Sequence, residues 1–193
     1  MKLGFMLLAA MLPLGVSSAA TWDILNDQSR VSFVTTKQGS VAEVNHFAAV
    51  EGTLTDSGQF SLDIPLIGVQ TGIDTRNERM QSMLFEIAKY PLLELSASVN
   101  MQAINAIAPG SQGVVTVDAK VAMHGKAQPM TFTVMVSRLN QDTMTVSSYQ
   151  PVIVSAAVFE LAAGVEKLRE VAGLQVISEA VPVSFVITLK QQP

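Results

Sequence analysis

Hydrophobic and polar residues alternate one by one along most of the chain after Trp22. Neighbouring side chains of a strand point to opposite faces, so this period of two predicts strands with one apolar face. The alternation is found in stretches 31–36, 61–66, 93–97, 115–121, 130–136 and 181–189. It is most regular in the last stretch, which predicts a long amphipathic strand close to the C-terminus.

Turn-forming residues separate these stretches. They lie at Thr55-Asp56-Ser57-Gly58, Pro109-Gly110, Gly125 to Pro129, Asn140 to Asp142 and Gln150-Pro151. Glycine, proline, asparagine and aspartate favour turns because of their backbone geometry and local hydrogen bonds. Short strands that follow one another at hairpin spacing are typical of antiparallel sandwiches and barrels, so we predict an all-β domain of about eight strands.

Two segments have helical spacing instead. The first starts near Thr75, a candidate N-cap, and must stop before Tyr90 because Pro91 cannot enter a helix interior. Its apolar residues follow at intervals of three and four: Met80, Met83, Leu84 and Ile87. The second runs from about Ala162 to Val171, and Gly173 is suited to end it. We therefore expect one or two short helices beside the strands.

The first twenty residues have the three parts of a secretory signal peptide. A positive start at Lys2 precedes an apolar stretch from Leu3 to Val16, and small residues follow at 17–20. We expect cleavage after Ala19 or Ala20, which would leave residues 21–193 as a single domain in a bacterial periplasm. No later run is long and apolar enough to span a bilayer, so no transmembrane anchor is expected.

Composition narrows the range of functions. The 193 residues include 12 basic and 16 acidic side chains, a net charge of −4, and this balance is unfavourable for nucleic-acid binding. The absence of cysteine excludes disulfides, cysteine zinc sites and iron–sulfur clusters. No nucleophile elbow or glycine-rich phosphate loop is present either. We therefore predict a protein that is not an enzyme and that uses no metal or cofactor.

The two histidines lie nearly eighty positions apart and belong to no metal-binding motif. His124 precedes a glycine between a strand and a turn, and we expect its ring to cap backbone groups of the loop. We expect His46 to be a solvated loop residue. A general base built from either histidine remains an alternative, because spatial clustering is invisible in a sequence.

Two stretches of the chain resemble the YceI-like family. The first runs from Val69 to Met80 and continues through Leu84-Phe85 to Lys89-Tyr90-Pro91. The second runs from Val121 to Phe132 and includes His124-Gly125 and Pro129. Weaker similarity is found at 22–33, 51–54 and 181–189, so the resemblance spans nearly all of the chain after residue 20.

The chain departs from the family pattern at four places. Arg76 is followed by Asn77, where family members usually have aspartate. Leu84-Phe85 stands in place of the aromatic pair, beside which family members usually have another aspartate. Asn45-His46-Phe47 replaces a small Gly-x-Phe pattern, and Val158 to Leu161 replaces Asp-Phe-Gly-Leu. Polar residues near the mouth of a cavity determine which head group it accepts, so these changes concern ligand choice more than fold.

The resemblance implies an extended, lipocalin-like antiparallel β-barrel with a helix near one opening. Related proteins bind long apolar chains such as polyisoprenoids, isoprenoid quinones or fatty-acid derivatives. By the same resemblance, this chain would be an exported protein that sequesters or carries an isoprenoid-type lipid, a long-chain amphiphile, and a homodimer is compatible with it. Two other readings stay open: a lipid-acting enzyme with a histidine base, and a solid barrel that docks a partner through a strand edge or residues 162–173.

Alternation and the family positions together select the candidate ligand-binding residues. The apolar candidates are Phe33, Phe47, Met80, Leu84, Phe85, Phe132, Val134, Phe159 and Phe185. Arg76 and Arg79 are candidates for contact with a polar or anionic head group. The alternative for the apolar residues is ordinary core packing. For the two arginines it is a solvated helix face or a salt bridge to Glu78 or Glu86.

Overall fold

A computed structural model describes residues 21–192 of the chain, and the predicted signal peptide, residues 1–20, lies outside them. Within this range the strands form one antiparallel sheet. They are β1 (Thr21–Ile24), β2 (Arg30–Lys37), β3 (Val41–Phe47), β4 (Glu51–Thr55), β5 (Gln59–Pro65), β6 (Val69–Gln70), β7 (Leu92–Ser98), β8 (Gln112–Met123), β9 (Lys126–Arg138), β10 (Thr143–Ser148), β11 (Val152–Ser155) and β12 (Ala180–Gln191).

The helical segments are short. The α-helices of the described range are α1 (Asp74–Arg79), α2 (Met101–Asn105) and α3 (Ala162–Val171). Single 3₁₀ turns are η1 (Asn26–Gln28), η2 (Leu66–Gly68) and η4 (Ala156–Phe159), and α1 continues into a wider π-type turn, η3 (Met80–Leu84). Between residues 21 and 192, no helix has the length and apolar character needed to cross a membrane.

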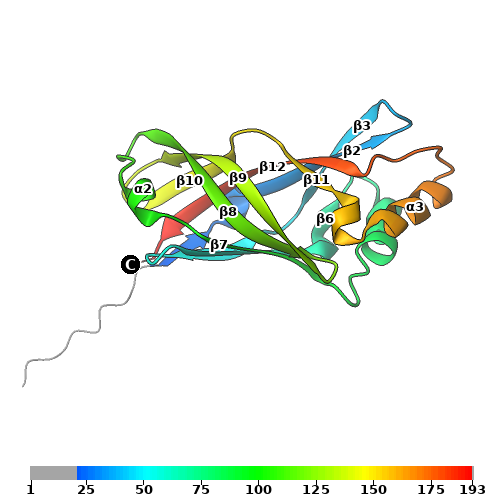
Figure 1. The fold of residues 1–193 in the computed structure, drawn as a ribbon, viewed down its shortest axis with the longest axis horizontal. Helices are drawn as coiled ribbons and strands as arrows, with labels where there is room; N and C mark the ends of the chain where they lie inside the picture. Colours follow the sequence, from blue (N-terminus) through cyan, green and yellow to red (C-terminus); the bar gives the residue numbers. More distant parts are fainter. Residues whose placement is uncertain (1–20, 193) are drawn as a thin grey trace, which may run out of the picture.

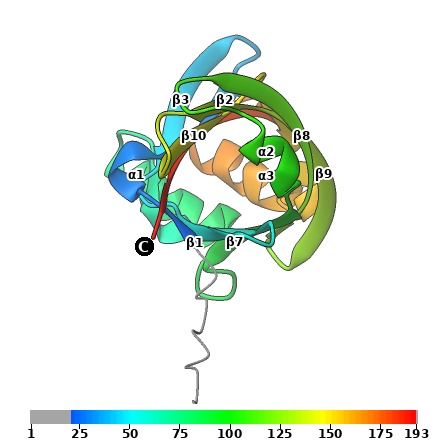
Figure 2. The same ribbon diagram turned by 90° about the vertical axis from the view of Figure 1, so that its left-hand side faces the viewer.

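Eight of the strands close into a barrel (Figures 1 and 2). The ring passes through β1, β4, β5, β7, β8, β9, β10 and β12, and it closes because β1 pairs with both β4 and β12. From β12 the sheet also continues through β2 and β3 to β6. The prediction of a lipocalin-like antiparallel barrel of about eight strands is therefore confirmed.

Strand β12 joins the two parts of the sheet. Its first half pairs with β11 and β2, and its second half pairs with β10 and β1. The regular alternation predicted from Val181 to Leu189 is present, since all the apolar residues of that set face the barrel interior. One face of β12 therefore lines the cavity along nearly the whole strand, which agrees with the regular apolar alternation of its sequence.

Helices lie at both ends of the barrel. Figure 2 shows α2 across the end nearest the viewer, while α1 and α3 lie at the opposite end (Figure 1). At that end Gly164 brings α3 against η3, because a Cβ on Gly164 would lie 2.8 Å from both the Leu84 Cα and the Met83 carbonyl oxygen. Only glycine allows so close an approach of the two segments.

The helix predictions are largely confirmed. Helix α3 has the predicted bounds, and Gly173 follows it with a left-handed φ of 64°. Helix α1 ends well before Tyr90, but its N-cap is Ile73, which has no side-chain capping bond, so the predicted Thr75 cap is wrong. Helix α2 was not predicted, because five residues are too few to produce a helical period.

The turn between β8 and β9 is shorter than predicted. His124 and Gly125 form it alone with φ angles of 53° and 74°, the conformation that two-residue hairpins favour. Strand β9 starts at Lys126, and Pro129 lies inside it opposite Lys120, so the predicted turn at 125–129 is wrong beyond its first residue. In a sequence, proline usually indicates a turn. It can also occupy a strand position whose backbone nitrogen is not needed as a hydrogen-bond donor to the neighbouring strand.

Candidate functional site

The barrel encloses an apolar cavity of about 510 Å³. This volume lies within the range of about 300–1,000 Å³ that is typical of small-molecule sites. Leu93, Phe132 and Val183 point into the cavity from three different strands, yet they are only half-buried. They keep accessible surface because no side chain from the opposite wall fills the space before them. The barrel is therefore hollow.

The cavity opens at the end that carries α1 and α3. Four of its lining residues are exposed: Ile73, Thr75, Val171 and Ala172. They belong to the start of α1 and the end of α3, so the mouth lies between these two helices. At the other end the lining includes Ile104 of α2, which is 3% exposed. The cavity is thus a blind tube with one mouth.

All eleven sequence-predicted site residues lie on the wall of this cavity. They are Phe33, Phe47, Arg76, Arg79, Met80, Leu84, Phe85, Phe132, Val134, Phe159 and Phe185. The aromatic rings form two groups of contacts. In the first, the ring centroid of Phe47 lies 5.3 Å from that of Phe33 and 6.2 Å from that of Phe85. In the second, the ring centroids of Phe132 and Phe185 are 6.2 Å apart. The wall is therefore rich in polarisable apolar surface.

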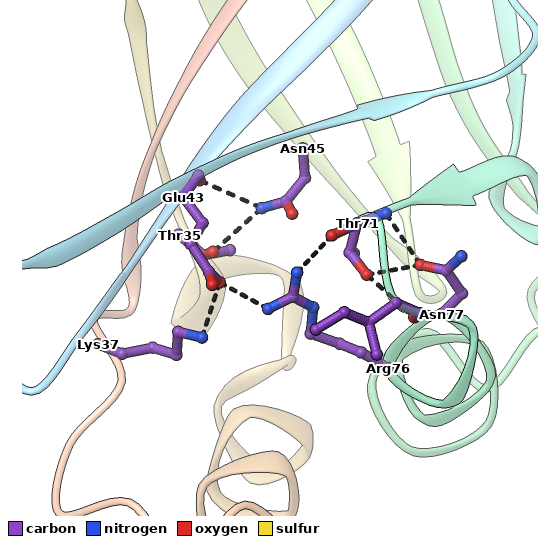
Figure 3. A network of polar contacts seen from close by, with 8 residues as sticks. Thr35, Lys37, Glu43, Asn45, Thr71, Arg76 and Asn77 are labelled. Carbon is purple, nitrogen blue, oxygen red and sulfur yellow. Dashed lines mark hydrogen bonds and ion pairs between the residues drawn. The ribbon is translucent and has the colours of Figure 1, made fainter.

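A polar network lies beside the mouth (Figure 3). Arg76 of α1 donates from Nη1 to the Glu43 carboxylate at 2.6 Å and from Nη2 to the Thr71 carbonyl oxygen. Lys37 Nζ lies 2.7 Å from the same Glu43 oxygen. One carboxylate thus links β2, β3 and α1. The alternative that pairs Arg76 with Glu78 or Glu86 is wrong, because its partner is Glu43.

The two cations keep Glu43 ionised. The hydrogen bond from Lys37 lowers the pKa of this carboxyl group, and the charge and hydrogen bond of Arg76 act in the same direction, while partial burial opposes them. At neutral pH the three side chains therefore carry one negative and two positive charges. The network has a net charge of +1 beside an otherwise apolar cavity.

Two amides complete the network. Asn77 is buried, and its Oδ1 accepts hydrogen bonds from the Thr71 backbone N–H at 2.9 Å and the Thr71 hydroxyl at 2.6 Å. Neither bond requires a negative charge, which explains how asparagine replaces the usual aspartate here. Asn45 donates from Nδ2 to Thr35 Oγ1 at 3.0 Å and to the Glu43 carbonyl oxygen at 3.3 Å.

Lys37, Glu43 and Thr71 were not among the predicted site residues, and Asn45 was noted only as a departure from the family pattern. If the alternation of stretch 31–36 is continued by one residue, it assigns Lys37 to the inner face. No such signal exists for the pairing of Glu43 with Arg76, because 33 positions separate them.

The two histidines differ from their predictions and lie outside the cavity lining. His124 caps no backbone group: both ring nitrogens are buried without a hydrogen-bond partner, and the ring packs on Tyr90 with a centroid distance of 4.6 Å. His46 lies on β3 and is half-buried, and burial lowers its pKa. Among residues 21–192, no group of three or more acidic or histidine side chains is arranged to hold a metal ion.

Comparisons with known proteins agree with this geometry. The family model of the YceI-like domain matches residues 22–189. One similar solved structure is described as a polyisoprenoid binding domain from Saccharophagus degradans implicated in plant cell wall breakdown. Its sequence is 34% identical to this chain, and its TM-score is 0.86. The match covers 89% of this chain and 98% of that one. BcnA from Burkholderia cenocepacia is 20% identical with a TM-score of 0.66, covering 86% and 99%, and shows the same fold. No curated protein matches the chain.

Proposed function

The chain belongs to the YceI-like family, and we propose that it binds a long-chain isoprenoid lipid, such as a polyprenyl chain or an isoprenoid quinone, inside its barrel. The observation that carries this proposal is the blind apolar cavity of about 510 Å³. The description of the Saccharophagus degradans relative as a polyisoprenoid binding domain supports the same ligand class.

The cavity wall supplies the binding energy. An apolar chain gains about 0.8 kcal/mol for each CH₂ group that it removes from water. A flexible chain can follow a tube lined by half-buried side chains such as Phe132 and Phe185, which lose their remaining exposure when it enters. Affinity of this kind needs no catalytic group.

The mouth determines the position of the head group. In this proposal the apolar tail points toward α2, and the polar end of the lipid stays near Arg76 and Arg79, which both line the cavity at the mouth. Apolar residues such as Phe33, Phe47 and Phe159 then contact the tail. An orientation of this kind leaves no polar group in the apolar end of the barrel.

We further propose that the protein works as a carrier or store after export to the periplasm. The signal-peptide pattern of residues 1–20 supports export. A water-insoluble lipid that crosses an aqueous compartment needs a cover, and a hollow barrel is suited to that role. Transport and sequestration both follow from the same binding reaction.

The other two readings receive less support. A lipid-acting enzyme would need its base within reach of the bound lipid, and both imidazoles lie outside the cavity lining. A barrel that acts only as a docking module would have a filled interior, whereas this one is hollow. Binding without turnover is the function that agrees with both observations.

Native mass spectrometry of protein purified from the periplasm without detergent tests the proposal. A stoichiometric adduct whose mass matches an isoprenoid lipid after organic extraction is the expected result, and the same spectrum reports monomer or dimer. A protein that stays free of adducts after incubation with polyprenyl and quinone lipids would overturn the proposal.

A further inference from the structure

The polar network at the mouth contains two buried atoms that lack a hydrogen-bond partner. They are the Oδ1 oxygen of Asn45, an acceptor, and the Nε–H group of Arg76, a donor. Both side chains line the cavity. All the other bonds of these two residues go to the protein: in Figure 3 the Asn45 nitrogen has two dashed lines, and its oxygen has none.

Asn45 cannot satisfy its own oxygen by turning the amide. Its Nδ2 group donates to the Glu43 carbonyl oxygen, and a turned amide would place one oxygen against another. The residue is 1% exposed, so bulk water does not serve the oxygen either. A fixed, buried acceptor without a donor is unfavourable, and a donor supplied by a ligand removes the penalty.

We propose that the lipid held in this cavity ends in a hydroxyl group, as an alcohol, a phenol or a hydroquinone does, and that this hydroxyl donates to Asn45 Oδ1. The inference rests on the proposed function and specifies the head group for the same site. The hydroxyl oxygen also accepts, which suits the free Nε–H of Arg76.

Other head groups match only half of this arrangement. A quinone carbonyl or a fully ionised phosphate has acceptors alone. Either could accept from Arg76, but each would bring an oxygen toward the oxygen of Asn45 without a proton between them. The network therefore favours the reduced, protonated form of a head group over its oxidised or ionised form.

Asn45 lies where the polar network meets the apolar wall. Glu43, Asn45 and Phe47 of β3 all line the cavity, so the amide stands between a charged and an aromatic side chain on the same face of the strand. The polar contact that Asn45 offers thus adjoins the surface that holds the tail.

The test compares three probes with the same tail: geranylgeraniol, its methyl ether and its monophosphate. Isothermal titration calorimetry measures their dissociation constants. The alcohol should bind about tenfold more tightly than the ether, which cannot donate, because one hydrogen bond to a buried group is worth about that factor. Equal affinity for the alcohol and the ether, or tightest binding of the phosphate, would overturn the inference.

Two variants assign the preference to Asn45. In Asn45→Leu the ratio of the two dissociation constants should fall to about one, since the acceptor is gone. In Phe47→Leu both probes should weaken by a similar factor and the ratio should persist, because Phe47 contacts only the tail. A ratio that survives in Asn45→Leu would contradict the assignment. If Asn45→Leu does not fold, as judged by circular dichroism, the comparison of probes with the unchanged protein still decides.

The outcomes also separate the inference from the proposed function. Failure of every probe to bind would contradict lipid binding itself. Binding of all three probes with no preference would leave the lipid-binding proposal standing and overturn only the hydroxyl contact.

Discussion

Half-burial of an inward-facing side chain is informative in this protein. Phe132 points into the barrel but keeps accessible surface, whereas Leu66 is fully buried and lies outside the cavity lining. The first contacts a space that a ligand can fill, and the second contacts only protein. The two residues therefore have separable roles in binding and in stability.

Truncation of Phe132 should reduce lipid uptake more than stability. We expect Phe132→Ala to lower the free energy of unfolding by about 1–2 kcal/mol, less than the roughly 3–5 kcal/mol of a tightly packed phenylalanine, because the side chain borders an existing space. Urea unfolding and a lipid-binding titration on the same sample measure the two effects.

Leu66→Ala is the matched control for Phe132→Ala. It should cost about 2–5 kcal/mol of stability and leave lipid affinity unchanged in the folded fraction. If Phe132→Ala proved as destabilising as Leu66→Ala and bound lipid normally, Phe132 would be a core residue and not a ligand contact.

At the residue scale, the sequence identified the apolar wall and two arginines, Arg76 and Arg79, but it missed the acidic partner of Arg76. Phe33 and Phe185 follow from the period of two, which depends only on neighbours along the chain. The contact between Glu43 and Arg76 depends on how β3 and α1 meet in space, and no local pattern encodes it. His124 illustrates the same limit, because its packing on Tyr90 joins residues from separate elements.

Two contacts between elements determine the shape of the mouth: the packing of α3 on η3, and the ion pairs that join α1 to β2 and β3. The first depends on Gly164 and the second on Glu43. Neither contact belongs to the hydrogen-bond ladder of the barrel. Each can therefore be changed while the strands stay in place.

Gly164→Ala should destabilise the protein. In a typical helix interior the change from glycine to alanine gains about 0.5–1 kcal/mol. Here the new Cβ would lie 2.8 Å from backbone atoms of Leu84 and Met83, so α3 must move away from η3. We expect a net loss of about 1–3 kcal/mol, measured by urea unfolding.

The exposed neighbour Ala163 provides the comparison for that variant. Ala163→Gly should lose about 1 kcal/mol through helix propensity alone. Stabilisation by Gly164→Ala would mean that α3 and η3 are not in close contact in solution.

Glu43→Gln should remove a pH-dependent part of the stability. The pKa of Glu43 is lowered in the folded protein, chiefly by the hydrogen bond from Lys37, so the folded state favours the ionised form. Its contribution is complete above the ordinary carboxyl pKa of about 4.3 and disappears as the pH falls through the lowered value. Because Glu43 is partly exposed, we expect a contribution of less than about 1 kcal/mol.

The measurement is the difference in unfolding free energy between the unchanged protein and Glu43→Gln from neutral to acidic pH. The difference should be positive at neutral pH and approach zero in acid. His46, whose pKa burial lowers, is present in both proteins, so its effect cancels. A difference that stays constant with pH would show that Glu43 acts only through its shape.

At the element scale, the elements with a regular hydrophobic period were predictable and the others, such as β3 and α2, were not. Strand β12 and helix α3 each carry enough residues for their period to appear. Helix α2 has five residues, and its main signal is Asn100, which accepts hydrogen bonds from the backbone of Gln102 and Ala103. Asparagine is common in turns as well as at helix N-caps. Without a helical pattern of apolar residues after it, an asparagine therefore does not predict a helix.

The whole molecule is a barrel that is closed along its strands, covered at one end by α2 and open at the other. Alternation predicted an antiparallel sandwich or barrel, and the family resemblance implied the closed barrel. Alternation is the same, however, for a filled barrel and a hollow one. The difference depends on the summed size of side chains that face one another across the interior. That sum requires the register of the strands, which only the structure provides.

A blind tube makes a specific prediction about ligand length. Affinity should rise along a series of prenols as each added unit buries more apolar surface, by about 0.8 kcal/mol for each buried CH₂, and should level off once the tube is full. Further units would lie in water at the mouth and add little. Calorimetry across the series locates the length at which affinity stops rising.

Val146→Phe should shorten the tube from within. Val146 of β10 lines the cavity and pairs with Ile187 in the second half of β12. Figure 1 shows β10 at the same end of the barrel as α2. A larger side chain there occupies space meant for the tail, so the plateau should move to shorter prenols while short prenols bind normally. The matched control is Val114→Phe, because Val114 is 51% exposed on the outer face of β8. An unchanged plateau in folded Val146→Phe would mean that the tail does not reach this part of the barrel, and the ligand would then have to lie near the mouth.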